Sequence, residues 1–134
     1  MYTIRKSDLP LIGSSYNFVG ADHEDVSVSV YLVEAEPGRG APLHTHEYDE
    51  IAFVQEGRGR ILVGSEIREV AAGDIVIVKA GTPHGFVNVG GAVLKQLDIH
   101  VNPTFRQENL EPTELSKRAG LPPKPATGPA HSNR

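Results

Sequence analysis

Cysteine is absent from this sequence of 134 residues. Its absence excludes disulfide bonds, thiolate nucleophiles and sulfur ligation of zinc or iron–sulfur clusters. Any metal site must therefore be built from histidine, carboxylate and water. These ligands accept iron, manganese, zinc or nickel, and histidine and carboxylate alone do not choose among them.

The chain also lacks a block of basic residues and a long apolar run. Its formal net charge is −4, and like charges occur only in short groups. Binding to nucleic acid or to an anionic membrane needs a concentrated basic patch, so we expect neither partner. No basic start followed by an apolar stretch is present, and no apolar run approaches the roughly 18 residues of a spanning helix. We therefore expect a cytoplasmic protein.

Glycine and proline are abundant, with 14 and 10 residues, and they punctuate short apolar segments. The segments alternate apolar and polar residues or are rich in valine and isoleucine, which is typical of β-strands. The expected strands cover residues 26–33, 51–54, 60–63, 66–70, 75–78, 86–89 and 93–101. Gly64-Ser65 predicts a type II′ hairpin, and Gly90-Gly91 predicts a hairpin between the last two strands. Such spacing indicates an all-β sandwich or barrel.

The C-terminal part differs in character. Thr113 is expected to cap a short helix over residues 114–119, which Gly120 ends. The following stretch is rich in proline and poor in large apolar residues, so it cannot bury enough surface to order itself. We therefore predict a barrel domain over residues 1–118 and a flexible proline-rich tail over 119–134.

The stretch H-T-H-E-Y-D-E, residues 44 to 50, contains two histidines and three carboxylates. His44 and His46 are one residue apart, so on an extended chain both imidazoles point to the same side. The two histidines either bind one metal ion together or are polar residues that happen to be neighbours. Spacing elsewhere in the chain decides between these readings.

Fixed spacings extend from this stretch in both directions. They read G-x5-H-x-H-x3-E-x6-G from Gly38 to Gly57, and Gly73, Gly81, His84 and Asn88 follow at offsets of 0, 8, 11 and 15. This pattern resembles the two motifs of the cupin superfamily. All five positions of the first motif match, and the second departs only where Lys79 replaces the usual proline.

The resemblance spans roughly residues 26–101 and implies a double-stranded β-helix, or jelly-roll barrel, of six to ten strands. It also implies one divalent metal per chain. The implied metal ligands are His44, His46, Glu50 and His84. Their imidazoles and carboxylate would leave about two positions of an octahedron open. Small cupins commonly form homodimers, through sheet faces or through exchanged terminal segments such as residues 2–5 and those after Pro103.

Several polar residues near this pattern are harder to place. Gln96, Asp98 and His100 share one face of their strand, and this face lines the cavity, meets water or contacts another subunit. Tyr48 and Asp49 either orient the site or lie exposed on a loop. Candidate catalytic residues are Glu50, Tyr48 and His100. Glu47, His23 and His131 are expected outside the site.

The predicted inward positions are otherwise apolar, with Ala52 and Val54 beside Glu50, and Phe86 beside His84. We therefore predict a metal-dependent, dioxygenase-like enzyme acting on a small, mainly apolar or aromatic oxygen-donor substrate. Two alternatives remain, because one fold hosts many chemistries. One is a non-redox isomerase, cyclase or lyase, and the other is a non-catalytic module that binds a small molecule. No DNA-binding helix pair is recognised beside the barrel.

Overall fold

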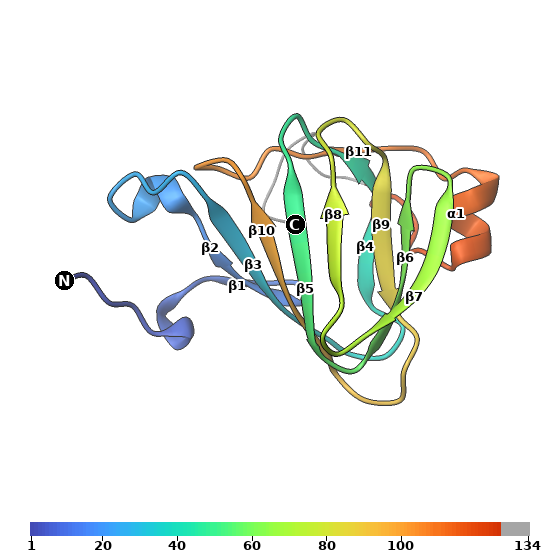
Figure 1. The fold of residues 1–134 in the computed structure, drawn as a ribbon, viewed down its shortest axis with the longest axis horizontal. Helices are drawn as coiled ribbons and strands as arrows, with labels where there is room; N and C mark the ends of the chain where they lie inside the picture. Colours follow the sequence, from blue (N-terminus) through green and yellow to red (C-terminus); the bar gives the residue numbers. More distant parts are fainter. Residues whose placement is uncertain (127–134) are drawn as a thin grey trace.

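Two antiparallel sheets face each other across the core in the computed structural model, which describes residues 1–126 (Figure 1). The first sheet has the order β1 (Leu11–Ile12), β2 (Ser15–Phe18), β3 (Ser29–Ala35), β10 (Leu94–His100), β5 (Glu50–Glu56), β8 (Ile75–Val78). The second has the order β11 (Glu108–Asn109), β4 (Gly40–Thr45), β9 (His84–Asn88), β6 (Arg58–Val63), β7 (Glu66–Ala71). The remaining elements are two 3-10 turns, Lys6–Asp8 and Gly20–Asp22, and the helix α1 (Glu114–Ala119).

The predicted all-β jelly-roll architecture with a short C-terminal helix is confirmed. Its eleven described strands exceed the expected maximum of ten by one, because β1 and β11 are short additions of two residues each. The hairpin at Gly64-Ser65 also forms, with Val63 paired to Glu66. Gly64 has a φ of 61°, and Ser65 is not among the non-glycine residues with positive φ, as a type II′ turn requires.

The hairpin predicted at Gly90-Gly91 is wrong, because the chain crosses there between the two sheets. β9 pairs with β4 and β6, whereas β10 pairs with β3 and β5, so Gly90-Gly91 joins opposite sheets. The Asn88 side chain holds this crossing by donating to the carbonyls of Ala35 and Ala92 and accepting from the Gly90 N–H. Similarly, β5 does not pair with β4, so Glu50 faces the histidines from the opposite sheet.

The interior of the barrel changes character along its length. At one end, buried apolar residues such as Val33, Val54 and Leu94 fill the space between the sheets. Each such side chain contributes about 1.5–3 kcal/mol by leaving water. At the other end the inward positions of the same strands are polar, with His100 paired in register to both Ser29 and Glu50. The barrel is therefore closed by an apolar core at one end and presents polar groups at the other.

The polar end carries three connections that lie together at the top of Figure 1. They are the β4–β5 loop, the β8–β9 loop and the segment that runs from β10 to β11. The first two loops are tied by a hydrogen bond of 2.8 Å from the Gly81 N–H to the His46 carbonyl. Gly81 has a φ of 80°, which favours glycine at this turn.

Helix α1 begins and ends where the sequence predicts. The Thr113 hydroxyl accepts from the Ser116 N–H, and Gly120 adopts the left-handed conformation with a φ of 78°. Ala119 is fully buried in a small cluster with Leu43 and Leu62, and Leu121 packs against this cluster. The first residues of the predicted tail thus contact the barrel, whereas residues 127–134, including His131, lie outside the described residues. No helix among the described residues is long and apolar enough to cross a membrane.

Candidate metal centre

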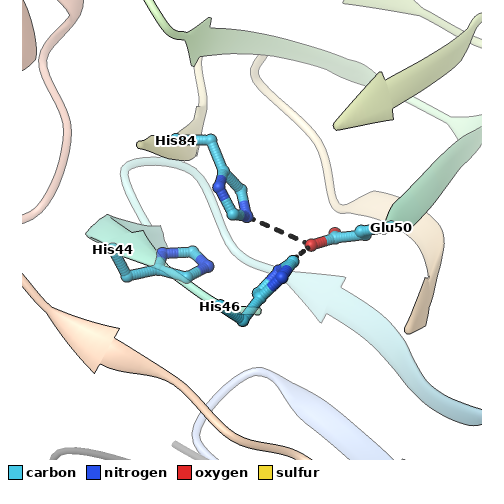
Figure 2. Close-up of side chains that lie close together, drawn as sticks. All are labelled: His44, His46, Glu50 and His84. Atoms are coloured by element: carbon cyan, nitrogen blue, oxygen red, sulfur yellow. Dashed lines mark hydrogen bonds and ion pairs between the residues drawn. The ribbon is translucent and has the colours of Figure 1, made fainter. Parts of the chain in front are cut away.

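Four side chains from both sheets converge at the polar end of the barrel (Figure 2). His44 lies on β4, His46 follows directly after this strand, and His84 begins β9 in the same sheet. Glu50 begins β5 in the opposite sheet. One potential ligand atom from each of these four residues, which are called the metal group below, lies within 4.8 Å of the other three. No residue of the metal group is more than 5% exposed.

Backbone carbonyls orient all three imidazoles in the same way. The Nδ1 atoms of His44, His46 and His84 lie 2.7, 2.8 and 2.8 Å from the carbonyl oxygens of Pro42, Tyr48 and Thr82. An Nδ1–H that donates to a carbonyl leaves the lone pair of a neutral imidazole on Nε2. This pattern is the usual support of a metal-ligating histidine, because it sets both the ring orientation and the tautomer.

The Nε2 atoms then face the carboxylate at short range. Oε1 of Glu50 lies 2.8 Å from Nε2 of His46 and 3.1 Å from Nε2 of His84. A lone pair on nitrogen and a carboxylate oxygen repel each other, so this buried contact is favourable only with a proton or a cation between them. The donor set of three imidazoles and one carboxylate fits a divalent metal of the first transition series. The residues can therefore hold a metal ion.

The pKa shifts of Glu50 and His84 agree with a negatively charged carboxylate that faces positive charge. Burial by itself would raise the pKa of Glu50, but the attraction of His100 and the hydrogen bonds from His46 and His84 hold this pKa well below its ordinary value. Burial opposes the charge on His84 as well, yet its contact with Glu50 raises its pKa above the ordinary value. The carboxylate is thus ionised, and it attracts positive charge to the centre of the site.

Tyr48 and His100 form a further chain of polar contacts that ends at Glu50. The hydroxyl of Tyr48 accepts from the Arg106 N–H at 3.1 Å and lies 2.7 Å from Nδ1 of His100. Burial raises the pKa of Tyr48 to about 12, so the hydroxyl keeps its proton. The hydroxyl and Nδ1 of His100 share one hydrogen bond. Nε2 of His100 lies 3.4 Å from Oε1 of Glu50, so the ring lies between the tyrosine and the carboxylate.

The other polar residues named from the sequence divide into two groups. Gln96, Asp98 and His100 all point into the barrel, where each is no more than 4% exposed, and the Gln96 amide donates to Asp98 at 2.8 Å. This answers the question that the sequence left open for this strand. The interior is consequently more polar than the apolar positions Ala52, Val54 and Phe86 suggested, although these three are buried as predicted.

The remaining polar residues named from the sequence lie at or near the surface and outside the metal group. Asp49 is half-buried and accepts from Lys79 Nζ and from the Ala80 N–H, both at 2.9 Å, so it ties the loop of Glu50 to the loop that precedes His84. Lys79, which replaces a proline of the motif, is therefore held by charge. Glu47 lies on the surface 3.5 Å from Arg106. His23 stacks on the Phe18 ring and shares a hydrogen bond with the Tyr2 hydroxyl, so these contacts are with the N-terminal part of the chain and not with the metal group.

Two cavities meet at the metal group. An inner cavity of about 10 Å³ lies between the sheets and is lined by His44, Glu50 and His84 among others. It has room for about one water-sized group. An outer cavity of about 340 Å³ opens at the polar end and is lined by His46, Glu47 and Arg106 among others. The outer cavity is therefore the one of the two that has room for a molecule larger than water.

Sequence reasoning missed Gln107, which is 3% exposed and lines both cavities. It lies in the segment that crosses the polar end before β11. The burial of Phe105 and Gln107 on either side of the exposed Arg106 follows the alternation of an extended chain. That alternation spans only three residues, which is too short a signal to recognise in a sequence.

Comparison with known families identifies the class of protein. The family described as "Cupin domain" matches residues 31–100, which are 70 of the 134 residues. The chain belongs to the cupin family. The match contains both histidines of the first motif, Glu50 and His84, so the convergent group lies within the family's own region.

Individual relatives agree on the fold. An uncharacterised protein of Streptomyces coelicolor is 38% identical over 65 residues, which are 48% of this chain and 60% of that protein. The chain thus matches less than two thirds of that relative's length. The oxalate decarboxylase of Lactobacillus farciminis, solved as a formate complex, has a TM-score of 0.69 and 21% identity over 78% of this chain and 34% of its own.

A structure of the Bacillus subtilis oxalate decarboxylase, which is described with Mn(II) centres, has a TM-score of 0.67 and 23% identity over 77% of this chain and 30% of its own. At these identities the two enzymes show a shared fold and do not assign an activity to this chain.

Proposed function

We propose that this chain is a metal-dependent enzyme that acts on a small oxygen-donor molecule at the His44, His46, Glu50 and His84 group. The observation that supports this most is the shared orientation of the three imidazoles, whose Nδ1 atoms all contact backbone carbonyls. A buried carboxylate in contact with two Nε2 atoms is costly without a proton or a cation between them.

The metal would be Mn(II) or Fe(II), with Zn(II) or Ni(II) as alternatives that the same donors accept. Manganese is favoured by the Mn(II) centres of the structurally similar Bacillus subtilis enzyme. When bound, such an ion supplies Lewis acidity and, for iron or manganese, a route for electrons. The protein would contribute the four side chains that hold the metal, and it keeps the inner side of the site too small for a molecule larger than water.

Glu50, Tyr48 and His100 are the proposed catalytic residues. Glu50 is a ligand whose low pKa favours its ionised form, so it can accept a proton only on leaving the metal. His100 lies between the two other residues, with Nε2 toward Glu50 and Nδ1 toward Tyr48. The pair can therefore exchange a proton with Glu50 when this carboxylate is free of the metal.

Dioxygenase-like chemistry is the first candidate reaction. It is supported by the four-residue donor set, which on an octahedral metal would leave about two positions open, and by apolar residues such as Ala52, Ile61 and Phe86 that line the inner cavity. The test is oxygen uptake by the Fe(II)- or Mn(II)-loaded protein with catechols, β-diketones and flavonols. Uptake with one of these classes is expected, and no uptake by loaded protein would contradict this reaction.

Non-redox catalysis by an isomerase, cyclase or lyase is the second candidate. The specific observation in its favour is that His100 and Asp98, which are not in the metal group, are buried in the inner cavity and offer an acid or base. Equal turnover with Zn(II) and Mn(II) in the absence of oxygen would separate it from the first. Ligand binding and thermal stability that survive a chelator unchanged would instead favour a non-catalytic binding module.

We also propose that the protein is a homodimer. On the outer face of the first sheet, two rows of apolar residues cross four strands in register: Leu32, Leu97, Phe53 and Ile75 in one row, and Val30, Ile99, Ile51 and Ile77 in the other. Ile75 and Ile77 are 63% and 64% exposed. Ile51 and Phe53 are exposed as well, whereas the four residues on β3 and β10 are half-buried. An apolar patch of this size is unusual on a monomer, and such a sheet face can pair with its own copy under twofold symmetry.

A further inference from the structure

Gln107 occupies a singular position at the metal group. Among the residues that line the inner and the outer cavity, it is the one common to both. Its backbone lies directly before β11, and Asn109 of that strand pairs in register with His44. The side chain therefore lies at the boundary that a substrate must reach to approach the metal group from the outer cavity.

The two ends of the Gln107 amide differ in their contacts. Nε2 donates to Oδ1 of Asn109 at 2.9 Å, which sets the orientation of the amide. Oε1 is buried, and within residues 1–126 it is the buried side-chain atom that has no hydrogen-bond partner. A buried acceptor without a partner costs roughly 1–3 kcal/mol, and native structures keep few of them. Such an atom indicates a position where a ligand supplies the donor.

The chemistry of an acceptor defines what it selects. An amide oxygen accepts from a hydroxyl or an N–H, and it rejects an ether oxygen or a carboxylate oxygen at the same place. A hydroxyl that also contacts a divalent metal is polarised and is a stronger donor than a free hydroxyl. The acceptor on Gln107 thus favours a donor that lies next to the metal-ligating oxygen of the substrate.

We propose that Gln107 is a substrate-binding residue, and that its amide oxygen selects small molecules with a hydroxyl beside the metal-ligating oxygen, as 2-hydroxy acids, hydroxyketones and catechols have. This inference rests on the proposed metal-dependent function and narrows its substrate class. It adds a requirement for a hydrogen-bond donor to the mainly apolar substrate predicted from the sequence. It also explains why a glutamine, and no apolar residue, is buried at this boundary.

The test compares two probes that differ in the donor. Glycolate and methoxyacetate are both bidentate oxygen ligands, but methylation removes the hydroxyl proton from the second. Their dissociation constants are measured on Co(II)-loaded protein by the visible spectrum of the metal. Wild type is expected to prefer glycolate. Gln107→Met, which keeps the length of the side chain but has no acceptor, is expected to reduce the preference roughly threefold to tenfold.

Gln55→Met is the matched control, because Gln55 is an exposed glutamine that lines neither cavity; it is expected to keep the wild-type preference. Gln107→Ala is measured in parallel, so that the result does not depend on how one variant folds. A preference that is equal in wild type, Gln107→Met and Gln107→Ala would overturn the inference, as would the absence of any preference in wild type. Failure of wild type to retain Co(II) on gel filtration would contradict the metal centre itself, and it is detected before any probe is added.

Discussion

The hydroxyl of Tyr48 lies 2.7 Å from Nδ1 of His100, 52 residues further along the chain, and both side chains are buried. This contact joins the β4–β5 loop to the end of β10, and through Nε2 of His100 it reaches Glu50. The metal group is therefore held by hydrogen bonds to backbone carbonyls on one side and by the pair of Tyr48 and His100 on the other.

Tyr48→Phe tests this support directly. The variant leaves Nδ1 of His100 and the N–H of Arg106 without their partner, which is expected to lower the free energy of unfolding by about 2 kcal/mol. Urea denaturation measures the change. Tyr2→Phe is the matched control, since Tyr2 makes a similar bond of 3.0 Å to His23 at the exposed surface, and its cost is expected to stay under about 0.5 kcal/mol. Equal costs for the two variants would contradict the role given to Tyr48.

The metal-free protein is expected to lose stability as the pH rises above neutrality. The pKa of His84 in the folded chain lies above its ordinary value of 6.5, so its stabilising contact with Glu50 is fully present below that pH and is lost as the pH rises through the raised pKa. The pKa of Glu50 is lowered, so its contribution is present above its ordinary value of 4.5 and is lost only in stronger acid.

Melting temperatures of chelator-treated protein measure this dependence between pH 5 and 9. The maximum is expected between the two ordinary pKa values of 4.5 and 6.5. His84→Gln is the control, because it removes the titrating group, and the fall toward alkaline pH should be shallower in this variant. A wild-type melting temperature that rises from pH 6 to pH 9 would be inconsistent with the raised pKa of His84.

Asp49 is expected to affect the metal site from the surface. Asp49→Ala frees the loop before His84 from the loop of Glu50, and we expect metal affinity to fall roughly tenfold, the lower range for groups that orient ligands. Lys79→Ala should change it much less, because that ion pair is exposed and the Ala80 N–H contact remains. Competition with a chromogenic chelator measures both.

Asp74→Ala controls for the general cost of removing an exposed loop aspartate. Asp74 accepts from the Ala71 N–H at 2.8 Å, at the far side of the barrel from the metal group. A fall in metal affinity of the same size in Asp74→Ala and Asp49→Ala would mean that the link between the two loops has no specific effect.

Sedimentation at micromolar concentration tests the proposed dimer. Ile77→Lys places a charge in the exposed apolar rows and is expected to weaken association about 100-fold or more, because the charge would be buried without a partner. Leu11→Lys is a comparable change at a residue that is 59% exposed on the outermost strand, and it should leave the dimer intact. A wild-type monomer would remove the proposal.

Local signals in the sequence predicted much of this fold. The helix over residues 114–119 has a cap at Thr113 and a stop at Gly120 that act within one turn of chain, and both form. The strand at residues 75–78 matches β8 at both ends. The crossing from β9 to β10 in the opposite sheet could not be predicted in the same way, because a two-glycine turn permits a hairpin and a crossing equally. The Asn88 side chain holds the crossing through its bond to the Ala35 carbonyl.

The candidate site could also be predicted only in part from the sequence. Resemblance to the two cupin motifs indicated His44, His46, Glu50 and His84, because the family pattern records which positions face one point. It did not show that Glu50 comes from the opposite sheet, since that depends on strand order. The inward direction of Gln96, Asp98 and His100 also needed the sheet, because alternation defines two faces but not which one is inside.

The central claim is that the four convergent residues hold a metal ion, and the metal content of gently purified protein tests it most directly. Elemental analysis of wild type should find about one divalent transition metal per chain, and His84→Ala should lose most of it, because one of four ligands is gone. His23→Ala, a histidine outside the group, should retain the wild-type content. Wild-type protein that takes up no metal when supplied with Mn(II), Fe(II) or Zn(II), or a His84→Ala variant with full content, would contradict the claim.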